Sequence, residues 1–163
     1  MKYAGIIKND VTAGEGVCVT FFTQGCPHHC PGCHNAQTWD FDGGEEFTQD
    51  VLSDILRSIE ANGVLRNFCV MGGEPLCPEN QFLTQLVISA VKERYPEIKI
   101  YIWTGYLYED LKSSSSSKLD TILNMTDVLI DGPYIQEERD ITLPMRGSRN
   151  QRIINLKAEN YDT

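Results

Sequence analysis

Three cysteines in one short segment have the residue type and spacing for metal chemistry. Cys26, Cys30 and Cys33 form the pattern C-x-x-x-C-x-x-C. A structural zinc ion takes four ligands, so three thiolates alone do not complete its site. In a cubane iron–sulfur cluster each iron ordinarily has its own cysteine, and three cysteines leave one iron open to another ligand. The spacing therefore favours a [4Fe-4S] cluster with one reactive iron.

A glycine-rich acidic segment is the second candidate for chemistry. Gly72, Gly73 and Glu74 stand before a proline and follow the apolar run Asn67–Met71, which is expected as a buried strand. Glycines let backbone carbonyls approach a ligand closely. A carboxylate suits an ammonium partner. This segment is therefore expected to bind a ligand with a positively charged group.

Two polar residues at later strand ends are weaker candidates. Thr104 follows the alternating run Ile98–Trp103, and Asp131 follows the run Val128–Ile130. Each could contact a ligand, directly or through a cation. Purely structural roles would account for both residues equally well: Asp131 could cap a turn, and Thr104 could simply end a strand.

Strands that alternate with helices must position these residues. The expected strands are Val17–Phe22, Asn67–Met71, Ile98–Trp103, Val128–Ile130 and Arg152–Asn155. Three helices are expected. One begins after the cap Thr48, one begins near Pro78, and one covers Leu119–Asn124. The cysteines lie in a Pro- and Gly-rich loop, 25–46, and the serine run 113–117 is expected as a flexible exposed loop.

This order of elements predicts an α/β fold with a mostly parallel sheet. In such sheets ligands bind beyond the carboxyl ends of the strands, where the candidate residues all fall. One domain spanning 1–163 is expected from the length. The chain is too short for eight strand–helix units, so the sequence predicts a partial, open (βα) barrel.

The composition of the chain limits the kinds of partner it can bind and the cellular compartment in which it is expected. The 163 residues include 14 Lys and Arg against 23 Asp and Glu, a net charge of −9, which argues against a nucleic-acid binder. No secretory signal and no membrane-length apolar run is visible, so no membrane partner and a cytoplasmic location are expected. There, clustered cysteines bind metal more readily than they form disulfides. Cys18, Cys69 and Cys77 are expected in or near the core.

The cysteine motif after the first strand, with G-G-E-P after the second, resembles the radical S-adenosylmethionine (SAM) superfamily. The resemblance implies that Cys26, Cys30 and Cys33 hold a [4Fe-4S] cluster whose open iron binds SAM. It also implies that the segment Gly72–Glu74 receives the amino group of SAM. Reductive cleavage of SAM would then give methionine and a 5′-deoxyadenosyl radical.

The segment around the third cysteine matches the stretch that lies near the adenine of SAM in this superfamily. Here it consists of Gly32, Cys33 and His34. Many members have an aromatic residue where this chain has Gly32, which weakens the expectation of an aromatic contact at this position. Of the three histidines in the loop, His34 is the best candidate for a contact beside the cluster ligands. His28 and His29 are expected to be solvated or to pack within the loop.

Within the superfamily, the chain is similar to the activating proteins of anaerobic ribonucleoside-triphosphate reductase. The similarity runs nearly end to end and is carried by G-C-P-H-H-C-P-G-C-H-N, T-W-D-F-D-G-G, W-T-G-Y, L-I-D-G-P-Y and R-G-S-R-N-Q-R-I-I. It implies that the 5′-deoxyadenosyl radical removes a Cα hydrogen from one glycine of the large reductase subunit. That subunit is the expected partner. Reduced flavodoxin or a similar protein is the expected electron donor.

The stretch 141–157 is basic, with Arg146, Arg149 and Arg152 and no acidic residue. These arginines could dock the partner, hold the SAM carboxylate, or form a solvated edge, and the sequence leaves this open. We expect Arg149→Ala to weaken partner binding without affecting SAM cleavage if docking is the role.

Three other functions remain open from sequence. The 7-carboxy-7-deazaguanine synthases are also small and share G-G-E-P, but typically have Asp-Thr where this chain has His34-Asn35. An activase of another glycyl-radical enzyme, such as pyruvate formate-lyase, shares C-H-N but is usually longer. A zinc-binding interaction module could use the three cysteines and one histidine.

Overall fold

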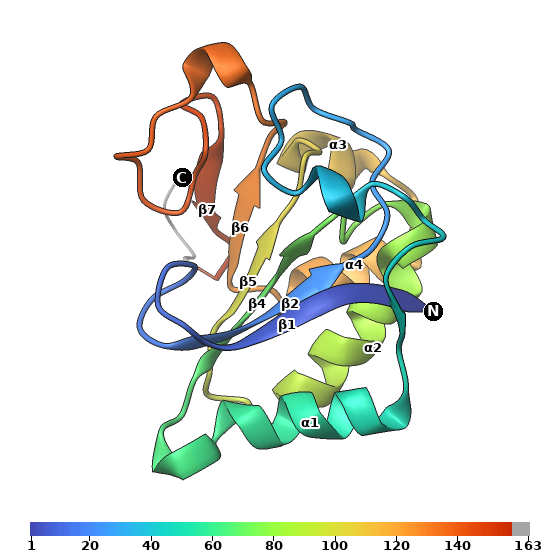
Figure 1. Cartoon of the computed structure of the whole chain (residues 1–163), viewed down its shortest axis with the longest axis vertical. Coiled ribbons are helices and arrows are strands. Elements are labelled where there is room, and N and C mark those ends of the chain that lie inside the picture. The colour runs from blue at the N-terminus through green and yellow to red at the C-terminus, as the bar shows by residue number, and fades with distance from the viewer. Residues whose placement is uncertain (158–163) are drawn as a thin grey trace.

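The computed structural model describes residues 1–157, which form one sheet of seven strands (Figure 1). The strands are β1 (Lys2–Asp10), β2 (Cys18–Thr23), β3 (Glu45–Glu46), β4 (Asn67–Gly72), β5 (Ile100–Trp103), β6 (Val128–Asp131) and β7 (Arg152–Asn155). The α-helices are α1 (Gln49–Ile59), α2 (Pro78–Arg94), α3 (Tyr108–Ser113) and α4 (Ser117–Met125). None of the helices in this part of the chain has the length and apolar character needed to cross a bilayer.

The sheet has the order β3-β1-β2-β4-β5-β6-β7 and is open, with β3 and β7 at its edges. The central strands β2, β4, β5 and β6 are parallel, as the alternation of strands and helices predicts. The outer pairs β3–β1, β1–β2 and β6–β7 are antiparallel. The carboxyl ends of the four central strands therefore meet at one edge of the sheet.

Strands β1 and β3, helix α3 and the serine loop differ from the sequence-based expectation. Strand β1 was not expected, because its side chains are mostly exposed or half-buried and its apolar residues do not alternate clearly. It is formed by antiparallel pairing with β2, with Ile6 opposite Phe21. The serine loop is shorter than expected, because Ser113 ends α3 and Ser117 begins α4. Between them, Ser116 Oγ accepts the Leu119 N–H and caps α4.

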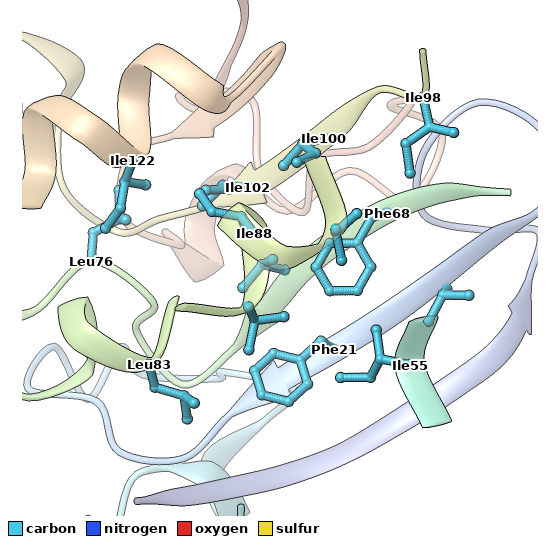
Figure 2. Close-up of a cluster of buried hydrophobic side chains, with 14 of the residues drawn as sticks. Phe21, Ile55, Phe68, Leu76, Leu83, Ile88, Ile98, Ile100, Ile102 and Ile122 are labelled. Carbon is cyan, nitrogen blue, oxygen red and sulfur yellow. The ribbon is translucent and has the colours of Figure 1, made fainter. Parts of the chain in front are cut away.

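The main hydrophobic core lies between the sheet and the helices on one of its faces. Phe21 and Phe68 point from β2 and β4 toward Ile55 of α1 and Ile88 of α2, and all four are fully buried (Figure 2). Burying a side chain of this size contributes about 1.5–3 kcal/mol. Helix α1 begins at the predicted cap, because Thr48 Oγ1 accepts the N–H of Val51.

The opposite face of the sheet is covered differently. Its apolar cluster consists of Ala13, Cys18, Cys69, Tyr101, Val128 and Ile130, and contains no helical residue of the described chain. Next to it is a cavity of about 360 Å³ lined by, among others, Phe22, Met71, Trp103 and Arg146. We call it the second-face cavity. The sheet thus has helices on one face and a hollow on the other.

Candidate functional site

The cysteine loop leaves the carboxyl end of β2 and folds back on its own later residues. The Gly25 N–H donates to the Thr38 carbonyl at 2.6 Å, and the Cys26 N–H donates to the Trp39 carbonyl at 3.2 Å. Gly25 has φ +103°, and a Cβ there would lie 2.1 Å from the Phe41 ring, so only glycine fits this turn. Figure 1 shows this loop beside the ends of the central strands.

The three cysteines differ in exposure. Cys26 is buried, whereas Cys30 and Cys33 are half-buried. The Cys33 N–H donates to the Cys30 carbonyl at 3.1 Å, and the Asn35 N–H donates to Cys33 Sγ at 3.3 Å. Burial raises the pKa of the Cys26 thiol. Because metals bind the thiolate, loading this position requires displacement of a proton.

Glu74 connects the loops that follow β2, β4 and β5. Its carboxylate is 1% exposed and accepts four hydrogen bonds. Oε1 lies 2.7 Å from His28 Nε2 and accepts the Gly105 N–H at 2.7 Å. Oε2 accepts the Thr104 hydroxyl at 2.7 Å and the Leu76 N–H at 2.9 Å. The expected ammonium-binding carboxylate is therefore engaged by the protein itself in this structure.

The glycines of the G-G-E-P segment allow β4 to end directly against the cysteine loop. Gly73 N–H donates to the Thr23 carbonyl, and Glu74 N–H donates to the Gly25 carbonyl. A Cβ at Gly73 would lie 2.3 Å from the Gly25 oxygen. Gly72 has φ +114°, and a Cβ there would lie 2.5 Å from Thr23 N. Both positions therefore exclude any side chain.

These loops surround a cavity of about 160 Å³. Six residues predicted from the sequence line it: Cys26, Cys33, Gly72, Gly73, Glu74 and Thr104. Four others do not line it: Cys30, Gly32, His34 and Asp131. Cys30 lies on the same loop, between two lining cysteines in the chain. The structure thus brings the ends of β2, β4 and β5 together around one space, which we call the cluster-end cavity.

Gly32 has a left-handed backbone conformation and lies beside the Gln136 side chain. Its φ is +79°, and a Cβ there would lie 2.1 Å from Gln136 Oε1. Next to it, the exposed His34 ring meets the Tyr134 ring edge-on at 5.7 Å. The residue 132–138 segment therefore packs where an aromatic residue at position 32 would lie.

Asp131 lies behind the cluster-end cavity. Its carboxylate is fully buried, accepts hydrogen bonds from the Arg152 guanidinium, and accepts the Tyr108 N–H at 2.8 Å. Arg152 also forms a bidentate pair with Glu109. Asp131 therefore caps the start of α3 and ties β6 to β7. Of the other arginines considered, Arg149 is exposed.

Sequence reasoning gave no role to the aromatic residues of this site. Trp39, Trp103 and Tyr134 line the cluster-end cavity. Trp39 Nε1 is buried and has no acceptor within the described chain, so a ligand in this cavity could supply one. The His29 ring stacks on Trp39 at 4.5 Å. Trp39 lies in the motif T-W-D-F-D-G-G and Trp103 in W-T-G-Y, and these two motifs could have indicated that the tryptophans belong to the site.

The donor set fits a [4Fe-4S] cluster. Three thiols stand on one loop, and two of them line a cavity opposite Gly72 and Gly73. Within residues 1–157 no three His, Cys, Asp or Glu side chains converge on a point that would hold a single metal ion. A cubane cluster does not need that convergence, because each thiolate binds a different iron.

Comparison with known proteins agrees with this donor set. Residues 12–154 match the family model described as a 4Fe-4S single cluster domain. The chain is 36% identical to the anaerobic ribonucleoside-triphosphate reductase-activating protein of Vibrio cholerae, over 94% of this chain and 97% of the relative. It belongs to this family of activating proteins.

Relatives from other organisms have the same name. The activating protein of Escherichia coli is 32% identical over 96% of this chain and all of the relative's length. That of Enterobacteria phage T4 is 35% identical over 94% of this chain and 93% of the relative. The sequence-based recognition of the reductase-activating family is therefore confirmed, and it is preferred to the deazaguanine synthases and to the zinc module.

Proposed function

We propose that this protein activates an anaerobic ribonucleoside-triphosphate reductase by generating a glycyl radical on its large subunit. The observation that carries the proposal is the cluster-end cavity, where two cysteines of the loop face the glycines after β4 in a chain of this family. When bound, the [4Fe-4S] cluster supplies one electron to cleave SAM into methionine and a 5′-deoxyadenosyl radical. That radical takes a hydrogen atom from a glycine Cα, which leaves 5′-deoxyadenosine and the glycyl radical.

We assign the cluster ligands to Cys26, Cys30 and Cys33. The backbone of Gly72 and Gly73, which no side chain obstructs, is assigned to the amino end of SAM. Glu74 is assigned to the same end of SAM, where its carboxylate holds this backbone against the cysteine loop through His28 and against the loop after β5 through Gly105. Thr104 lines the same cavity. Gly32 and His34 are assigned to the adenine side.

Asp131 is proposed to act on SAM only indirectly. Its carboxylate is occupied by Arg152 and by the Tyr108 N–H, and it does not line the cavity. It fixes the end of β6, and the next residue, Gly132, does line the cavity. Asp131 thereby positions backbone that faces the ligand.

The open sheet, with helices on one face only, supports the assignment to a partial radical-SAM (βα) barrel formed by a single domain. The second-face cavity shares the lining residues Met71 and Trp103 with the cluster-end cavity, so the two lie next to each other. We propose that the glycine-bearing loop of the reductase reaches the site along this face. A bound loop there would exclude water from the radical.

We also propose an electron donor and a compartment for this reaction. A reduced flavodoxin or similar low-potential protein would supply the electron. All six cysteines are free thiols, which suits a reducing cytoplasm.

The test is anaerobic reconstitution with iron and sulfide, followed by reduction and EPR spectroscopy with and without SAM. The proposal predicts a [4Fe-4S]⁺ signal that changes when SAM is added. Cys26→Ala, Cys30→Ala and Cys33→Ala should each abolish or strongly reduce that signal. Cys18→Ala is the matched control, because Cys18 is a buried thiol at the opposite end of β2 and should leave the signal intact. A signal that ignores SAM would refute the cofactor assignment.

A further inference from the structure

The middle of the cysteine loop has one side chain that reaches the loops after β4 and β5. His28 stands midway between Cys26 and Cys30, and its Nε2 lies 2.7 Å from Glu74 Oε1. Glu74 already accepts three other hydrogen bonds, so its carboxylate is the acceptor and His28 Nε2 carries the bridging hydrogen. The contact joins residues 46 positions apart in the chain.

The His28 ring also fits its surroundings closely. A Cβ at Gly105 would lie 2.6 Å from His28 Cδ2, so the ring covers the Gly105 backbone. The Tyr106 ring meets it edge-on at 4.6 Å. The His28 side chain is 19% exposed and the Glu74 side chain 1%. A hydrogen bond to a charged group in such a shielded place is among the stronger polar contacts in proteins.

The neighbouring histidines do not provide an equivalent tie. His29 is exposed and stacks on Trp39, within the same loop. His34 is exposed and meets Tyr134. Main-chain hydrogen bonds from Gly73 and Glu74 fix the loop only where it begins, at Thr23 and Gly25. Beyond Cys26, His28 is the side chain that holds the loop to Glu74.

We propose that His28 is a positioning residue of the active site. Through Glu74 it fixes the segment between the first two cysteines against the loops after β4 and β5, so that the thiolates and the SAM-facing backbone keep a set separation. This role rests on the proposed function, because the distance between the cysteines and the backbone after β4 matters only if a cluster binds the former and SAM the latter. The three thiolates themselves do not depend on His28 for cluster binding.

The first test uses the protein without cofactor, and measures amide hydrogen exchange at Gly105 and Leu76. His28→Leu removes the donor and keeps bulk, whereas His28→Gln keeps an N–H donor at a similar reach. We expect exchange at Gly105 to rise about tenfold in His28→Leu, and to stay within about threefold of the wild type in His28→Gln. Unchanged exchange in His28→Leu would overturn the proposal, whatever the cofactor chemistry.

The second test titrates SAM against the reduced, reconstituted protein and follows the EPR change. We expect His28→Leu to assemble the cluster but to need about tenfold more SAM, equivalent to ~1.4 kcal/mol. His28→Gln should restore most of the affinity. If His28→Leu and the wild type have the same SAM midpoint, the proposal fails. If the wild type itself does not respond to SAM, the proposed function fails, and the exchange data still decide the positioning role.

A third variant guards against misfolding of His28→Leu. Gly105→Ala keeps the histidine at position 28 but adds a methyl group that would collide with its ring. This variant should therefore push the ring away from Glu74 and break the His28–Glu74 hydrogen bond. We expect it to raise both the exchange at Leu76 and the SAM midpoint. Should His28→Leu not fold by circular dichroism, wild-type midpoints in both His28→Gln and Gly105→Ala would contradict the proposal. A normal midpoint in the first with a raised midpoint in the second would support it.

Discussion

The ion pair between Asp131 and Arg152 places a fully buried carboxylate at the site end of the sheet. Asp131 is fully buried and the Arg152 side chain is 45% exposed. The carboxylate also accepts the Tyr108 N–H, so its position depends on both β7 and α3. A buried carboxylate that loses its partner pays the cost of desolvation without compensation. The pair is therefore a stability element that lies directly behind the cavity.

Arg152→Met tests this role at the level of the single residue. We expect the free energy of unfolding, measured with urea, to fall by about 2–3 kcal/mol, because the Asp131 carboxylate stays buried without its cation. Arg57→Met on α1 is the control, since its side chain is 71% exposed and its contact with Asp54 is long, at 3.7 Å. Unchanged stability with weaker SAM binding would instead assign Arg152 to the SAM carboxylate.

Single residues of the site were predictable from the sequence to different degrees. The cysteines and glycines were found because their chemistry is tied to residue type and spacing. The engagement of Glu74 was not predictable, since its donors come from residues 28, 76, 104 and 105 and meet only after folding. Asp131 was expected near the ligand, and the cation that occupies it comes from the next strand in the sheet.

At the scale of elements, the close approach of the β4 end to the β2 end forms the site. Gly73 makes this approach possible, because a Cβ there would collide with the Gly25 carbonyl oxygen. Backbone contacts of this kind cannot yield as flexible side chains can. The loop after β4 can therefore approach the cysteine loop this closely only because Gly73 has no Cβ.

Gly73→Ala should therefore separate the two loops. We expect a loss of about 2–4 kcal/mol in unfolding free energy and loss of the SAM-dependent EPR change, because the loop after β4 must move away from the cysteines. Gly5→Ala is the control, since Gly5 lies in β1 with nothing within 4 Å of an added Cβ. A Gly73→Ala protein with normal stability and a normal SAM response would show that the contact is not needed.

Periodicity predicted the elements whose faces are buried. Strands β2, β4, β5, β6 and β7 and helices α1, α2 and α4 were expected close to their observed bounds. Strands β1 and β3 and helix α3 were missed, because long-range contacts form them. β1 is paired to β2, and the six-residue α3 begins where Asp131 accepts the Tyr108 N–H.

At the scale of the whole molecule, the two faces of the sheet have different tasks. The helices and the main core stabilise one face, and the other face has the second-face cavity, which adjoins the cluster-end cavity at Met71 and Trp103. Two exposed apolar residues in the segments around this hollow are Val11, 70% exposed, and Ile141, 82% exposed. Arg149 is exposed in the basic stretch 141–157, and its N–H donates to the Glu138 carbonyl, so residues 137–140 lie beside it. We propose its side chain as a charged contact with the partner.

Arg149→Ala tests the docking surface. We expect binding to the large reductase subunit to weaken two- to fivefold, by about 0.4–1 kcal/mol, with a reduced salt dependence, because rim charges mainly steer association. SAM cleavage without the reductase should be unchanged. Arg57→Ala, on α1, is the control for loss of one exposed positive charge. Equal loss of SAM cleavage and partner binding would contradict docking as the role of Arg149.

The central claim is that this protein places a radical on a glycine of the reductase. The most direct measurement is anaerobic EPR of the large reductase subunit after incubation with the reconstituted protein, SAM and a reductant. The account predicts a glycyl-radical doublet, with one 5′-deoxyadenosine formed for each radical, and no doublet when SAM is omitted or Cys30→Ala is used. SAM cleavage without any radical on the reductase would contradict the account and direct the search to another substrate.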